Sequence, residues 1–108
     1  MALFLLQAAY TSEAWAKQLQ NPKNRAEAVR PVIKKLGGKL VNSWLSFGEY
    51  DLVAVCEMPD NVSAAAFAMA AAAGGALKSH KTTPLFTMEE GIKAMKKAVG
   101  AGYRAPGA

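Results

Sequence analysis

Two predicted strands of this chain are apolar on both of their faces, and this restricts the possible folds more than any other feature. Residues 2–10 (ALFLLQAAY) carry apolar side chains in both alternating sets, and residues 51–58 (DLVAVCEM) repeat the pattern. A strand with one face in water alternates apolar with polar residues instead. Both faces of the sheet that these strands form are therefore expected to be covered.

The segment 37–59 is predicted to be a hairpin. A strand over about residues 39–47 is joined to the strand over 51–58 by a tight turn at residues 47–50, and Pro59 ends the second strand. The turn gathers a glycine, aromatic side chains and a carboxylate, and glycine supplies the backbone freedom that tight turns need. The other elements are expected to bury this hairpin.

Helices and one further strand account for the rest of the chain. Helical periodicity and capping residues predict helices over about residues 12–19, 22–36, 62–73 and 87–99. Thr87 and Glu90 form a capping box at the start of the last of these. The helix over 62–73 consists mainly of alanine, so we expect it to lie close to its neighbours. A strand is predicted over 77–86. Pro84 indicates that this strand lies at a sheet edge or is bulged there, because proline cannot donate to a ladder.

The order βαββαβα is typical of an α+β ferredoxin-like sandwich with an added C-terminal helix. Such a sheet carries its helices on one face only. Since the second face is also apolar here, we expect a second copy to cover it, which gives a sheet-to-sheet dimeric α+β barrel. Residues 1–100 are expected to form a single domain and residues 101–108 a loose tail.

Composition excludes several classes of protein. Of the 108 residues, 52% are hydrophobic and 19% charged, which is too apolar for a disordered chain. Cys56 is the only cysteine, so an intrachain disulfide and a cysteine-based zinc site are excluded. The net charge of +5 is spread along the chain, and the strand over 51–58 offers no aromatic side chain to stack a base. We expect a cytoplasmic protein with no membrane span, nucleic-acid partner or cofactor.

Residues 45–60, LSFGEYDLVAVCEMPD, resemble the GYD domain family, whose motif corresponds here to Gly48, Tyr50 and Asp51. The resemblance extends over about residues 2–97 because the order of elements around the motif also agrees. It implies a small dimeric α+β barrel protein, in a family without an assigned biochemical role. The alanine-rich helix and His80-Lys81 depart from the pattern.

Three side chains are candidate catalytic residues. The Tyr50 hydroxyl could donate a hydrogen bond to a ligand oxygen, and the Asp51 carboxylate could act as a base. His80 is the only histidine and the only side chain expected to titrate near neutral pH. The alternative interpretation is structural, with Tyr50 and Asp51 in an ordinary hairpin turn and His80 on the surface.

Three residues are candidates for ligand binding. Trp44 and Asn42 share one alternation of the first hairpin strand, and an aromatic side chain beside hydrogen-bonding groups suits a small-molecule pocket. Gly48 lies in the adjoining turn. Packing in a core or interface is the alternative for Trp44. Cys56 lies in an apolar strand and is expected to be inert.

We expect a small homo-oligomeric protein that binds an organic ligand in a pocket between sheet and helices. A cofactor-free isomerase or oxygenase of the dimeric α+β barrel type is one alternative, so enzymatic activity stays open. A structural or assembly protein is another. The chain has no phosphate loop and no Ser/His/Asp set with supporting spacing.

Overall fold

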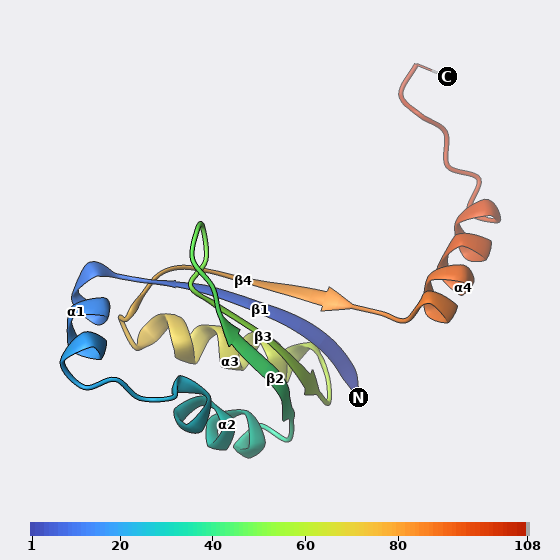
Figure 1. Cartoon of the computed structure of the whole chain (residues 1–108). Coiled ribbons are helices and arrows are strands. Elements are labelled where there is room, and N and C mark those ends of the chain that lie inside the picture. Colours follow the sequence, from blue (N-terminus) through green and yellow to red (C-terminus); the bar gives the residue numbers. More distant parts are fainter. Residues whose placement is uncertain (108) are drawn as a thin grey trace.

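The computed structural model describes residues 1–107 and consists of one antiparallel sheet with four helices (Figure 1). The elements are β1 (Ala2–Tyr10), α1 (Ser12–Gln20), α2 (Arg25–Lys35), β2 (Lys39–Leu45), β3 (Leu52–Met58), α3 (Asn61–Ala73), β4 (Leu77–Leu85) and α4 (Met88–Val99). The expected α+β ferredoxin-like order of strands and helices is confirmed.

The sheet order is β2-β3-β1-β4, with every neighbouring pair antiparallel. The two strands that are apolar on both faces, β1 and β3, therefore lie in the centre. β4 lies at an edge and pairs only with β1, as Pro84 predicts. The β2 strand ends at Leu45, two residues earlier than expected, because residues 46–51 form a wider turn.

Side-chain caps fix where the helices begin. Asn24 precedes α2, and its Oδ1 accepts a hydrogen bond from the Ala26 amide at 2.9 Å, so this helix begins three residues later than the sequence suggests. Asp60 caps α3 in the same way, and the Ser63 amide holds the pKa of its carboxyl below the usual value. The predicted capping box of Thr87 with Glu90 is confirmed at α4.

One face of the sheet packs against α2 and α3. The buried side chains of the core come from β1, β2 and β3 and from the two helices, and they are Phe4, Ile33, Leu40, Ala54, Cys56, Met58 and Ala64. Strand pairing sets Phe4 beside Cys56 and Cys56 beside Leu40, so these residues share the half of the sheet that holds the start of β1. The core therefore fills one half of the helix-covered face.

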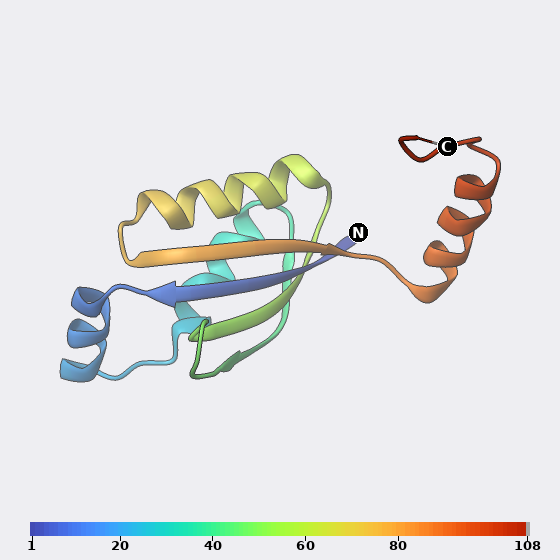
Figure 2. The same ribbon diagram turned by 90° about the horizontal axis from the view of Figure 1, so that it is seen from above.

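The opposite face of the sheet has no helix of the described residues over it, and its centre is apolar, whereas Gln7, Glu57 and Lys81 add polar groups toward its ends. Register places Leu3 beside Leu85, Leu5 beside Val55, and Val53 beside Trp44 on this face. Figure 2 looks onto it and shows no helix in front of the strands. Trp44 is 53% exposed there. We call this surface the open face.

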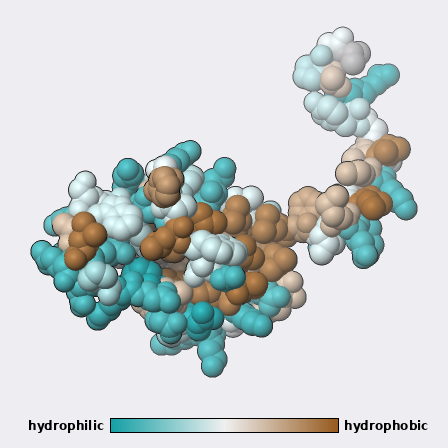
Figure 3. Space-filling view, in the orientation of Figure 1, coloured by the Kyte–Doolittle hydropathy of each residue, from teal (hydrophilic) through white to brown (hydrophobic). Residues whose placement is uncertain are grey.

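The last helix stands away from the body of the molecule (Figure 1). The radius of gyration is 17.3 Å, whereas a compact chain of this length has a value of about 13 Å. The apolar stripe of α4 is exposed, from 51% at Ile92 to 87% at Val99. In Figure 3 hydrophobic surface gathers over the body and reappears on α4. Within residues 1–107, no helix is long and apolar enough to cross a membrane.

Close packing at Gly38 gives the first test of this fold. A Cβ added there would collide with the Glu57 carbonyl oxygen and Met58 Sδ, because Gly38, just before β2, lies against the end of β3. We predict that Gly38→Ala lowers the free energy of unfolding by about 1–3 kcal/mol in urea titrations, since overpacking forces the neighbouring atoms apart. Gly100→Ala is the control, because its nearest atom would be 3.6 Å away. Equal stability of the two variants would contradict the close approach.

Candidate functional site

The hairpin turn is held by its own hydrogen bonds. The Ser46 amide donates to the Asp51 carbonyl oxygen at 2.7 Å, and Ser46 Oγ donates to the Tyr50 carbonyl oxygen at 2.7 Å. Gly48 has φ +138°, a backbone region that side chains rarely permit. The role of Gly48 that follows from this geometry is to close the turn.

Asp51 connects the turn to the end of β1 and the start of α1. Its Oδ2 accepts hydrogen bonds from the Tyr10 amide at 2.9 Å and from Trp15 Nε1 at 3.2 Å. Its own amide donates to the Ala8 carbonyl oxygen at 2.8 Å. The rings of Tyr10 and Trp15 meet edge to face, with centroids 5.4 Å apart. The carboxylate is thus engaged by neighbours within the protein.

A cavity of about 390 Å³ lies on the helix-covered face. It is bounded by α2, α3 and the strands β1, β3 and β4, in the half of the sheet that the core does not fill. Most of its lining is apolar, and the larger apolar side chains are Leu6, Val29, Val32, Leu52 and Phe67. Polar groups come from Tyr10, Arg25, His80 and Thr82.

The cavity exists because the second half of α3 carries small side chains. Ala64 is buried in the core, but Ala68 and Ala71 face the cavity with a single methyl group each. Phe67 is the one large side chain that α3 places there. The expected close approach of this helix therefore holds at Ala64, whereas further along the helix the small residues leave space.

The structure separates the six candidate residues. His80 lines the cavity, since its pairing with Ala8 puts its side chain on the helix-covered face. Tyr50 and Asp51 are not among the cavity-lining residues and lie at the end of the hairpin. Tyr50, Asp51 and His80 are therefore not brought into one site.

Asn42 and Trp44 share one face, as their alternation predicts, and that face is the open one. Register pairs Asn42 with Val55 and Trp44 with Val53. Trp44 also borders a second hollow of about 300 Å³ next to Gln18 and the start of α2. Neither Asn42 nor Trp44 lines the larger cavity.

Sequence reasoning missed Tyr10, Arg25 and Phe67 as cavity residues. The three residues come from three different elements, β1, α2 and α3, and only the folded chain brings them to the same cavity. The only sequence signal was the change from large to small side chains along α3, and it was interpreted as close packing. Over the described chain, no group of three or more His, Cys, Asp or Glu residues could hold a metal ion.

Cys56 is fully buried, and burial raises the pKa of its thiol to about 11. The thiol is therefore protonated at neutral pH, and the nucleophilic form is the thiolate. This agrees with the expectation that Cys56 is inert.

The family of the chain follows from comparison with known proteins. The model of the GYD domain matches residues 4–95, which include the sheet except for the first two residues of β1, α1 to α3 and most of α4. The chain belongs to the GYD domain family.

Two further comparisons define how far this similarity reaches. The crystal structure of FFRP-DM1 is similar to this protein with a TM-score of 0.50 and 14% sequence identity, over 80% of this chain and 100% of that chain. At this identity the likeness concerns the fold alone. No curated protein matches the chain.

The contacts of Asp51 predict a structural effect of its removal. Asp51→Ala leaves the Tyr10 amide and the Trp15 indole without their acceptor, so we expect unfolding free energy to fall by about 1–3 kcal/mol. Asp51→Asn keeps one acceptor oxygen and should lose less. Urea unfolding followed by tryptophan fluorescence measures both. Glu49→Ala in the same turn is the control and should match the wild type, whereas an Asp51→Ala variant as stable as this control would contradict a structural role.

Proposed function

We propose that this GYD domain protein binds a small, largely apolar organic molecule in the cavity between α2, α3 and the sheet, and that it does so as a homodimer. The cavity is the observation that carries the proposal. Its volume of about 390 Å³ falls within the range of about 300–1,000 Å³ that is typical of small-molecule sites. Cytoplasmic location stays a prediction from the sequence.

The composition of the lining supports binding. Apolar side chains form most of the wall, and Tyr10, His80 and Thr82 offer a few polar groups that could orient a ligand. Filling this space with larger side chains would stabilise the fold, because empty apolar volume costs free energy. A bound apolar molecule would recover the same contacts.

The open face supports self-association. The centre of this face is an apolar surface that no other part of residues 1–107 covers, and it is formed by Leu3, Leu5, Val53 and Val55. Because the cavity lies on the other face of the sheet, two copies could pack through their open faces without blocking it. A second copy of the same sheet offers a surface of the same shape and chemistry.

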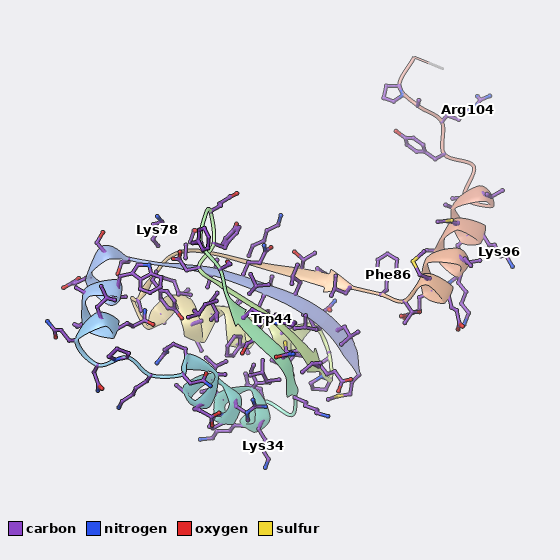
Figure 4. All side chains as sticks on the ribbon, in the orientation of Figure 1. Lys34, Trp44, Lys78, Phe86, Lys96 and Arg104 are labelled. Atoms are coloured by element: carbon purple, nitrogen blue, oxygen red, sulfur yellow. The ribbon has the colours of Figure 1, made fainter. Side chains whose placement is uncertain are left out.

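The area of the interface indicates a part for α4. Four strands spaced ~4.8 Å apart, with ~3.3 Å per residue, give the open face a flat area of about 500 Å². A standard interface buries about 800 Å² on each partner. The exposed stripe of Met88, Ile92, Met95 and Val99 can supply further area. Figure 4 shows Phe86 at the junction of β4 and α4, so apolar surface continues from the sheet toward this helix.

An isomerase or oxygenase of this fold is the less favoured candidate. It would need Tyr50, Asp51 and His80 to act together, whereas only His80 lines the cavity and the Asp51 carboxylate is engaged by Tyr10 and Trp15. A purely structural role leaves the cavity without a use. We therefore place binding ahead of both alternatives.

Filling the cavity tests the binding proposal. Ala71→Leu adds three carbon atoms from α3 into the space, and we expect at least about a tenfold weaker binding of 1-anilinonaphthalene-8-sulfonate, an apolar fluorescent probe. The free energy of unfolding should stay the same or rise, because the added side chain fills a void. Fluorescence titration and urea unfolding measure the two quantities.

The matched control is Ala72→Leu, one residue along the same helix. Ala72 is exposed and does not line the cavity, so its replacement should leave probe binding at the wild-type level. If Ala71→Leu and the wild type bind the probe equally, the cavity is not the binding site.

A charge on the open face tests the assembly. Val53→Asp would bury a carboxylate between two copies, which is strongly unfavourable. We expect sedimentation velocity to show a dimer for the wild type and a monomer for the variant at the same concentration, with unchanged circular dichroism. Val62→Asp, at an 80% exposed position of α3, should remain dimeric. A monomeric wild type, or a dimeric Val53→Asp variant, would show that the open face is not the interface.

A further inference from the structure

Charged groups at the cavity indicate what chemistry its ligand carries. The basic residues among the lining residues are Arg25, His80 and Lys81, and no aspartate or glutamate is among them. Resting on the proposed binding function, we propose that the ligand is a small amphipathic acid, with one anionic group and an apolar body.

Three of the polar lining residues, Tyr10, Arg25 and His80, lie at one end of the cavity. Arg25 is the first residue of α2 and borders both hollows together with Leu52, which pairs with Ala8 of β1. Register pairs Tyr10 with Leu77 and Ala8 with His80, so Tyr10 and His80 lie at the same end of the sheet. An anionic group would lie here, within reach of hydrogen-bond donors.

The opposite end of the cavity is mainly apolar, and Thr82, which pairs with Leu6, is the polar residue there. Leu6 pairs with Ala54, which belongs to the buried core, and Phe67 packs against that core from α3. A hydrocarbon or aromatic body would therefore lie against Leu6, Val32 and Phe67 while its charge stays near Arg25. This separation of polar and apolar walls matches an amphipathic molecule and gives it a single orientation.

Two features of α2 favour an anion at its start. The N-terminal end of a helix carries a partial positive charge from its free amide groups. The planar guanidinium of Arg25 presents paired donors that suit a carboxylate. The residue that caps α2, Asn24, is neutral, and its Oδ1 accepts a hydrogen bond from the Ala26 amide. The lining at this end of the cavity therefore offers a cationic side chain, Arg25, and no carboxylate.

The other charged residues nearby do not line this end of the cavity with their side chains. Alternation sends the Lys81 side chain to the open face, since Lys81 pairs with Gln7, so this residue acts only over a distance. Two acidic residues lie near this end, Glu27 in the first turn of α2 and Asp51, and neither is among the cavity-lining residues. The Asp51 carboxylate keeps its negative charge, but its Oδ2 accepts hydrogen bonds from the Tyr10 amide and the Trp15 indole. The position open to a further anion is at Arg25 and His80.

Three ten-carbon probes that differ in their polar group test the inference. Isothermal titration calorimetry with decanoate, 1-decanol and decylammonium, each kept below its aggregation concentration, compares an anion, a neutral molecule and a cation of similar size. We expect decanoate to bind the wild-type protein at least about tenfold more tightly than decanol, and decylammonium to bind most weakly, because a charge-assisted hydrogen bond to Arg25 is available only to the anion.

Charge-removing variants then locate the preference. Arg25→Gln should reduce the ratio of decanoate to decanol affinity about tenfold, and His80→Gln should reduce it by a smaller factor. Lys34→Gln is the control, since it removes the same charge from α2 at a side chain that points away from the sheet (Figure 4). Its ratio should equal that of the wild type.

The outcomes separate this inference from the proposed function. Equal binding of decanoate and decanol, with both weakened by Ala71→Leu, would overturn the anionic ligand while the cavity stays the binding site. A ratio that falls equally in Arg25→Gln and Lys34→Gln would reduce the preference to overall charge and would also overturn it. No binding of any probe would overturn the proposed function itself.

Discussion

The pairing of β1 with β3 in the centre of the sheet determines the rest of the molecule. Both strands carry apolar side chains on both faces, so burial of only one face leaves a large apolar surface in water. The chain itself supplies a cover for one face through α2 and α3. The core and the cavity lie on the helix-covered side of this central pair, and the open face lies on the other side.

The helix-covered face is divided into a packed half and a hollow half. At the packed half, Ile33 and Met58 are fully buried and meet Phe4 and Cys56 in one cluster. At the hollow half, alanines of α3 face the same sheet and leave the cavity between them and α2. Stability is therefore concentrated at one end, which lets the other end keep an open volume.

Local pattern predicted most of the fold, because strand alternation, helix caps and proline positions act over a few residues. The capping box at Thr87 and the edge position of the strand with Pro84 were both confirmed for this reason. The contacts of Asp51 could not be predicted in this way. Its partner Tyr10 is 41 residues away, and only the folded sheet brings the two together.

The same limit applies to the candidate site. Alternation showed that Asn42 and Trp44 share a face, but a shift in register between Leu40 and Asn42 and the position of α2 decide which face that is. The cavity was harder to predict because it results from small side chains on α3 that leave space unfilled. A run of alanines fits both close packing and an open space, and the facing side chains of α2 and the sheet decide between them.

The cavity and the centre of the open face are built on the same strands, but they are formed by different side chains. On β1, Leu6 and Ala8 face the cavity, while Leu3 and Leu5 face the opposite side. A substitution on one set changes one surface and leaves the other intact, since successive side chains of a strand point to opposite faces. The proposed ligand binding and the proposed self-association could therefore be altered separately, and any coupling between them would have to pass through the backbone of β1 and β3.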